Sequence, residues 1–344
     1  MSSAGGAEPA FPDSADEVSR CQTERRAIAE RPTARAPTVR ERSRRTPRRT
    51  LDLHGLGGDM NANSSYGGIG FVLLERKSFL PSSPSSAVQV VLFTSEEPLY
   101  LPQYIEPILD AHAADVDRLV IAPFDAPLSR QVREQFGMYG PRAGFRMAVR
   151  YLRGHALDAL GRHLGIQIGG YHSVAAVARA HGVPVERVAD VSNPAFIERM
   201  RALDPDVILS VVAGQRLPPE LIDRSNDAIN LHGSLLPKYR GRATAFWPLY
   251  YGDDRTGVTA HRMTEQFDAG PVIARRAFSI EPTDTVDSVY RKLSATGASL
   301  AVDLLDSYPD LPEASPNETT ADDYHSLPGP DERRRFRNRG NEFL

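Results

Sequence analysis

Short apolar runs and amphipathic segments alternate along the middle of the chain. The runs at 88–93, 119–122 and 206–212 are rich in β-branched residues, which is typical of buried strands, and a further strand is predicted within 183–191. The intervening segments carry apolar residues at helical spacing and predict helices over residues 104–111, 173–181 and 194–203. Strands that alternate with helices favour an α/β fold, a doubly wound and mostly parallel sheet of the Rossmann-like type with right-handed crossovers.

Residues 128–170 interrupt this alternation with two predicted amphipathic helices. Their apolar positions are interleaved with arginines: Arg130, Arg133, Arg142, Arg146, Arg150, Arg153 and Arg162. Two interpretations are open. The segment is a helical lid whose arginines face water, or some of these arginines bind a phosphorylated or nucleotide-linked substrate, because guanidinium groups pair well with phosphate.

After residue 250 the pattern predicts two strands and a long helix. The strands are expected at 257–263 and 272–280, and the amphipathic helix at 285–307. Residues 308–344 are mostly polar and include a basic run at 333–337. They are interpreted as a docked C-terminal segment or a frayed tail, since they are too few for a second folded domain.

Residues 1–86 are rich in Ser, Pro, Gly and Arg and lack sustained apolar periodicity, which is typical of a disordered extension. Two other interpretations of this arginine-rich segment stay open. One is a start codon assigned too early, with Met60 as one candidate for the true start. The other is a functional basic arm or a transit peptide, although the acidic residues among the first seventeen argue against a transit peptide.

Composition and charge narrow the classes of function that this protein can have. The formal net charge of −3 conceals an asymmetry, because arginines crowd the first fifty residues and the remainder is acidic. The folded part is therefore expected to lack a general affinity for nucleic acid. The single cysteine, Cys21, excludes an intrachain disulfide, and no apolar run approaches the ~20 residues that span a bilayer. A cytoplasmic protein without a membrane partner is expected.

Polar residues suited to catalysis lie in three glycine-containing segments. They are Asn230-x-His232-x-Ser-Leu-Leu-Pro237, Gly257-Val-Thr-Ala-His261 and Phe-Asp268-Ala-Gly270-Pro. Asn230 and His232 are two residues apart, so in an extended segment both side chains point to the same face. An amide can donate to a developing oxyanion, an imidazole can move a proton near neutral pH, and a carboxylate can orient both. These are the groups needed to transfer an acyl group to an amine.

The combination of these segments resembles the folate-dependent formyltransferases, which include glycinamide ribonucleotide, methionyl-tRNA and amino-sugar formyltransferases. The resemblance covers roughly residues 88–310. It implies that Asn230 holds the oxyanion, that His232 moves the proton, and that Asp268 orients the histidine and a water that relays the proton. His261 is expected to help shape the site. The expected organisation is a disordered extension over 1–86, a formyltransferase catalytic domain over 87–310 and a C-terminal tail over 311–344.

The same resemblance implies 10-formyltetrahydrofolate as the formyl donor and places its site beside the catalytic residues. The residues expected to contact it are Arg216, Leu217, Leu236, Pro237 and Gln266. A flat pterin ring edged with donors and acceptors suits a slot with apolar walls and backbone amides. No metal site is expected, because the nine histidines show neither paired spacing nor clustered carboxylates.

Differences between this sequence and particular formyltransferase subfamilies narrow the range of possible acceptor substrates. Glycinamide ribonucleotide formyltransferases carry a glycine- and serine-rich phosphate loop after the first strand, and here that place reads Thr94-Ser-Glu-Glu-Pro-Leu-Tyr100, whose carboxylates would repel phosphate. The C-terminal β-barrel of methionyl-tRNA formyltransferases would need a longer chain. The expected substrate is the primary amine of a small molecule, a nucleotide-linked amino sugar. A carrier-bound or secondary-metabolite amine, methionyl-tRNA-like activity, hydrolysis of the donor and a catalytically silent binding protein stay open, as does a homodimer.

Overall fold

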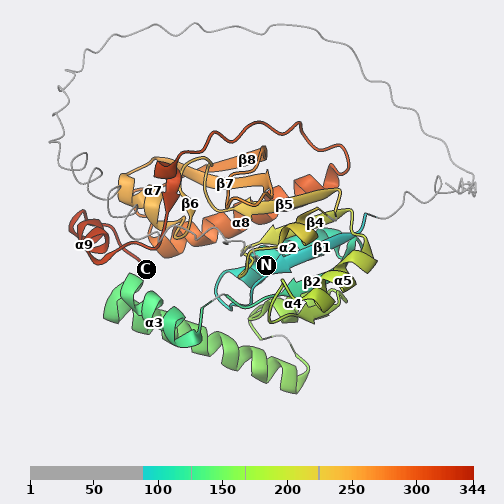
Figure 1. Cartoon of the computed structure of the whole chain (residues 1–344). Coiled ribbons are helices and arrows are strands. Elements are labelled where there is room, and N and C mark those ends of the chain that lie inside the picture. Colours follow the sequence, from blue (N-terminus) through green and yellow to red (C-terminus); the bar gives the residue numbers. More distant parts are fainter. Residues whose placement is uncertain (1–87, 125, 167, 224) are drawn as a thin grey trace, which may run out of the picture. The chain divides into compact units, whose positions relative to one another are not determined.

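The computed structural model describes residues 88–344 apart from 125, 167 and 224. The extension predicted over residues 1–86 lies outside the described residues. A seven-stranded sheet has the order β3-β2-β1-β4-β5-β7-β8 (Figure 1). The first five strands in this order are parallel, and β7 and β8 join antiparallel at one side. The prediction of a mostly parallel sheet is therefore confirmed. The strands are β1 (Val90–Thr94), β2 (Val116–Ile121), β3 (Val185–Arg187), β4 (Val207–Val211), β5 (Asp227–His232), β7 (Arg255–Arg262) and β8 (Val272–Ser279).

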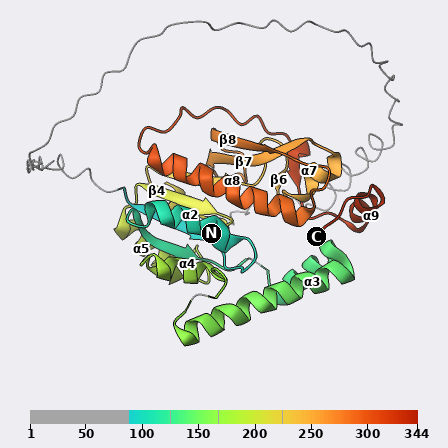
Figure 2. The same cartoon turned by 180° about the vertical axis from the view of Figure 1, so that it is seen from behind.

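Both faces of the sheet are covered, as the continuous apolar runs of its central strands require. Alternate residues of one strand enter two separate apolar cores, for example Val90 and Leu92 in one core and Val91 and Phe93 in the other. Figure 2 shows two helices, α2 and α8, on one face, where α4 also packs. On the opposite face lie α5 and α6. The bounds are α2 (Leu101–His112), α4 (Val174–Ala180), α5 (Pro194–Leu203), α6 (Pro219–Ile222) and α8 (Val286–Asp306).

The segment between β2 and α4 forms a long helical arm, α3 (Leu128–Leu164), outside these two layers (Figure 1). Gly140 has φ of 75° and ψ of 174° within it, so the arm consists of two helices joined at a kink. The prediction of two helices is thus confirmed. The second helix is tied to α8, because Arg150 donates to Asp287 at 2.8 Å and Asp287 also accepts from the hydroxyl of Tyr100 at 2.5 Å.

The C-terminal segment docks onto the helix α7 (Phe246–Tyr251) and the short strand β6 (Arg240–Gly241). Its strand β9 (Tyr324–His325) pairs with β6, and its helix α9 (Pro330–Asn338) follows. Phe336 is fully buried and Phe343 is 4% exposed, and both rings contact Phe246. Of the two sequence interpretations of this region, the docked segment is the correct one. No helix in the described part of the chain has the length and apolar character needed to cross a membrane.

Candidate active site

The candidate catalytic residues lie where three neighbouring strands meet. Asn230 and His232 lie on β5 and face β7, with Asn230 opposite His261 and His232 opposite Thr259. On the other side β5 pairs with β4, where Ser210 is the register partner of Asn230. This is the carboxyl end of the parallel strands, the edge at which ligands bind in open α/β sheets. The adjacent β4, β5 and β7 are labelled in Figure 1.

Hydrogen bonds fix the orientation of the Asn230 amide. Nδ1 of His261 donates to the backbone carbonyl of Arg262 at 3.0 Å, so Nε2 of the neutral ring is an acceptor. That Nε2 lies 3.1 Å from Nδ2 of Asn230, which donates to it. Oδ1 of Asn230 faces the other way and accepts from the hydroxyl of Ser210 at 2.9 Å. One N–H of the amide therefore remains available to a ligand.

His232 is held by a backbone carbonyl and a carboxylate. Its ring is almost completely buried, and Nε2 donates to the carbonyl of Tyr239 at 3.0 Å. Nδ1 lies 3.4 Å from Oδ1 of Asp268. Because the carbonyl keeps the proton of the neutral ring on Nε2, Nδ1 is the nitrogen that can take up a further proton. The imidazolium so formed would face the Asp268 carboxylate.

Asp268 is kept ionised by its surroundings. Burial alone raises the pKa of Asp268, but the neighbouring His232 and His261 rings and the N–H of Gly241 together hold that pKa well below its usual range. The Gly241 N–H donates to Oδ2 at 2.9 Å, and Nε2 of His261 lies 3.6 Å from Oδ1. A single carboxylate thus contacts both histidines, and its negative charge is fixed at ordinary pH.

The backbone of the loop that carries Asp268 restricts which residues can occupy it. Asp268 has φ of 50°, a left-handed conformation that aspartate tolerates better than most residues. A Cβ on Gly270 would overlap the carbonyl oxygen of Arg262, so only glycine lets the loop approach β7. Arg240 donates to the Phe267 carbonyl at 2.6 and 3.1 Å, and Asn317 donates to the Asp268 carbonyl at 3.0 Å. The close approach to Arg262 explains the glycine two residues after Asp268, and the hydrogen bonds hold the loop in place.

The residues predicted to contact the folate donor lie in different environments. Leu217 and Leu236 are 4% and 2% exposed, and Leu217 lies in the apolar core. Pro237 is half-buried, whereas Gln266 is exposed. Arg216 is exposed, donates to the Glu265 carbonyl and lies over the ring of Phe267, with the guanidinium 5.4 Å from the ring centroid. The structure therefore brings Arg216 to the segment that contains Gln266.

A surface pocket of about 490 Å³ lies between the loop after β4 and this segment. Its lining consists of Asp190, Val191, Ser192, Gln215, Arg216, Pro218, Pro219 and Glu265. It offers an arginine, an amide and carboxylates within one depression, which suits a flat ring with both donors and acceptors on its edge. Gln215, Arg216, Pro218 and Pro219, which follow β4, thus form one wall of this pocket.

The start of α2, after the first strand, holds an acidic side chain in place of an anion. Glu97 accepts three backbone N–H groups, from Leu99 at 2.9 Å, Tyr100 at 2.6 Å and Leu101 at 2.5 Å. Burial raises the pKa of Glu97, and these three donors oppose that shift. The N–H groups at a helix start are a frequent phosphate site. Here the Glu97 carboxylate already occupies them.

Sequence reasoning missed three residues that build the site. Ser210 appeared as one small polar residue within an apolar strand, and Tyr239 contributes only its backbone carbonyl to His232. Arg240, to which the sequence analysis gave no role, is only 4% exposed and anchors the Asp268 loop. The one available signal was Ser210, since a hydroxyl at a fully buried strand position needs a hydrogen-bond partner.

Residues 172–305 match the formyl transferase family. This segment contains Asn230, His232, His261 and Asp268, so the resemblance inferred from the motifs is confirmed.

Solved structures of similar proteins include a phosphoribosylglycinamide formyltransferase from Anaplasma phagocytophilum, 18% identical over 63% of this chain and 86% of that one, with a TM-score of 0.44. A sugar N-formyltransferase from Shewanella is 17% identical over 69% and 76%, with a TM-score of 0.45. An N-formyltransferase from Helicobacter canadensis, in complex with folinic acid and dTDP-3-aminofucose, is 16% identical over 70% and 71%, also with a TM-score of 0.45.

Proposed function

We propose that this chain, whose residues 172–305 match the formyl transferase family, transfers a formyl group from 10-formyltetrahydrofolate to the primary amine of a small substrate. The observation that carries the proposal is the convergence of Asn230, His232 and Asp268. The Asn230 amide has a fixed orientation, and Asp268 lies 3.4 Å from the His232 ring. These are the positions from which an amide, an imidazole and a carboxylate act together in acyl transfer.

Asn230 would stabilise negative charge on the formyl oxygen as the amine attacks. Its free N–H is preorganised, because Ser210 and His261 hold the two ends of the amide. A donor fixed in this way needs no reorganisation as charge develops, and removing one such donor typically costs roughly 2.7–4 kcal/mol of activation free energy.

His232 would take up the proton that the amine loses. Nε2 is committed to the Tyr239 carbonyl, so the proton would be held at Nδ1. Asp268 then faces the charged ring, and its low pKa keeps it from competing for that proton. The proton passes directly or through an ordered water, which the distance from a substrate amine would decide.

The folate donor supplies the formyl group to be transferred. The polar lining of the 490 Å³ pocket fits its ring, with Arg216 and Gln215 as donors and the backbone of the Glu265 segment opposite. Leu236 and Pro237 would contribute the apolar side of the slot nearest His232. The contact roles of Arg216, Leu217, Leu236, Pro237 and Gln266 are proposed on this basis.

The acceptor we favour is an amino sugar linked to a nucleotide. Glu97 blocks the start of α2 as a phosphate site, which argues against an acceptor of the glycinamide ribonucleotide type. Hydrolysis of the donor would use the same three catalytic residues, so the acceptor experiment must separate the two reactions.

The test is to incubate the protein with 10-formyltetrahydrofolate and follow tetrahydrofolate release, with and without a panel of nucleotide-linked amino sugars. Release that depends on an amine, together with a formylated product, supports the proposal, whereas release without amine indicates hydrolysis. Asn230→Ala, His232→Ala and Asp268→Asn should each lower turnover by about 10²-fold or more while circular dichroism stays unchanged. Near-normal turnover in all three variants would refute the mechanism.

A further inference from the structure

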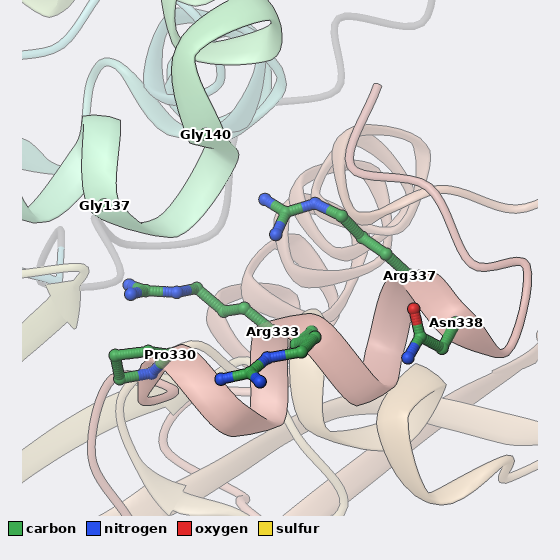
Figure 3. Close-up of a pocket in the computed structure, with 7 residues that line it drawn as sticks. Gly137, Gly140, Pro330, Arg333, Arg337 and Asn338 are labelled. Carbon is green, nitrogen blue, oxygen red and sulfur yellow. The ribbon is translucent and has the colours of Figure 1, made fainter.

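A second pocket, of about 370 Å³, lies between the arm α3 and the C-terminal helix α9. Its lining consists of Gly137, Gly140, Pro330, Arg333, Arg334, Arg337 and Asn338. Figure 3 shows the side chains of Arg333 and Arg337 extending from α9 toward the part of α3 that carries the two glycines. The lining thus contains three guanidinium groups and no carboxylate.

The three arginines differ in their partners. Arg334 pairs with Asp331 at 2.7 Å, one turn before it on α9. Arg337 donates to the backbone carbonyls of Met138 and Tyr139, at 3.5 and 3.2 Å, where the first helix of α3 ends. In the described part of the chain the Arg333 guanidinium has neither an ion pair nor a hydrogen bond. Arg333 is therefore a half-buried cation, and the described lining of its pocket contains no carboxylate.

The electrostatics agree with this geometry. Burial lowers the pKa of Arg333, and the nearby charge of Arg337 lowers it further, while Glu332 offsets only part of the effect. Two like charges held close together in a partly buried site repel, and an anion between them would relieve the repulsion.

The glycines of α3 make room for the guanidinium groups. A Cβ on Gly137 would lie 3.2 Å from a terminal nitrogen of Arg333, and a Cβ on Gly140 would lie 2.9 Å from one of Arg337. Gly140 also has φ of 75°, which strains any other residue. At these two positions the arm is thus closely approached by arginine side chains from a helix almost two hundred residues later.

We propose that this pocket binds a phosphate group of the acceptor substrate, an inference that rests on the function proposed above. Guanidinium groups bind phosphate oxygens through paired N–H bonds, and among the described residues none accepts a hydrogen bond from the Arg333 side chain. With the start of α2 filled by Glu97, the pocket provides the cationic site that a nucleotide-linked amine would still need.

Both walls of the pocket are connected to Gly241, which contacts Asp268. Gly241, whose N–H donates to Asp268, is followed by Arg242, which pairs with Glu134 on α3 at 3.0 Å. Gly137 lies one helical turn beyond Glu134, about 5 Å along the axis. On the other side, the C-terminal segment pairs with Gly241 through β6 and β9. The pocket is thus connected to the Asp268 loop through Gly241 and Arg242.

The decisive experiment measures binding of inorganic pyrophosphate to the full-length protein by isothermal titration calorimetry. Wild-type protein should bind, and Arg333→Gln should bind about tenfold more weakly or not at all, since a charge-assisted bond is lost. Arg335→Gln is the matched control, because it removes the same charge from the same helix outside the pocket lining. Without anion, Arg333→Gln should melt at or above the wild-type temperature, whereas loss of a structural arginine would lower it.

A second experiment tests whether the pocket binds the acceptor substrate. Arg333→Gln should raise KM for a phosphate-bearing amine about tenfold and leave kcat and the KM for 10-formyltetrahydrofolate unchanged. Absence of pyrophosphate binding in wild type, equal binding by Arg333→Gln, or an unchanged acceptor KM despite lost pyrophosphate binding would each overturn the proposal. Calorimetry needs no turnover, so Arg333-dependent binding in a protein that formylates no amine would refute the proposed function while supporting an anion site.

Discussion

Replacement of Ser210 by alanine tests the claim that the Asn230 amide is held in one orientation. Ser210 is 2% exposed, and its hydroxyl donates to Oδ1 of Asn230 at 2.9 Å. The change removes this bond and leaves the side-chain oxygen of the half-buried Asn230 without its donor. The amide keeps its contact with His261, because the Arg262 carbonyl holds the His261 proton on Nδ1. The orientation should therefore be weakened and not abolished.

The expected magnitude lies between that of a normal hydrogen bond and that of a lost catalytic donor. A neutral hydrogen bond contributes about 1 kcal/mol net, and an unsatisfied buried acceptor costs about 1–3 kcal/mol. If one to two kcal/mol of this falls on the transition state, kcat drops roughly 5- to 30-fold. Asn230→Ala should lower kcat more, by about 10²–10³-fold, because the donor itself is gone.

A double-mutant cycle provides the assay. Formation of tetrahydrofolate from 10-formyltetrahydrofolate is followed for Ser210→Ala, Asn230→Ala and the double variant. If Ser210 acts through Asn230, the double variant should be no slower than Asn230→Ala. Ser294→Ala is the control, since Ser294 is 4% exposed and its hydroxyl donates to a backbone carbonyl within α8 and not to Asn230. Wild-type kcat in Ser210→Ala, or fully multiplicative losses in the double variant, would refute the reasoning.

Two further predictions concern stability. Asp287→Ala should lower the free energy of unfolding by roughly 1–3 kcal/mol, because Asp287 accepts from both Tyr100 and Arg150. Burial raises the pKa of Asp287, but these partners outweigh it and the folded-state pKa is lowered. The difference in the free energy of unfolding between wild type and Asp287→Ala should therefore be largest above about pH 4. It should shrink as the pH falls through the folded-state pKa of Asp287, and urea titrations at several pH values measure it. Glu97→Ala should destabilise the protein by about 1–3 kcal/mol, because three N–H groups lose their acceptor. Added phosphate should restore part of the melting temperature in Glu97→Ala but not in Glu106→Ala, and equal effects in both would contradict the capping role.

The local pattern of the chain was enough to predict the sheet and the catalytic strand. Alternating apolar runs and amphipathic segments gave the elements of the parallel sheet, because burial on two faces requires continuous apolar strands. The i, i+2 spacing of Asn230 and His232 placed both on one face of β5, as the register shows. Their motif, together with the Asp268 turn, indicated formyl transfer, and residues 172–305 match the formyl transferase family.

Only the tertiary structure determined which contacts orient the Asn230 side chain and which residues surround Arg333. Ser210 meets Asn230 because β4 and β5 are neighbours in the sheet, and strand order cannot be read from one strand's sequence. Gly137 and Arg333 meet because the C-terminal segment docks onto β6 and α7, although a polar, arginine-rich stretch is equally compatible with a frayed tail. Composition and spacing fix which residues favour a strand, a helix or a turn. Which side chains satisfy one another's hydrogen bonds and charges depends on contacts between residues far apart in the chain, and these exist only in the folded protein.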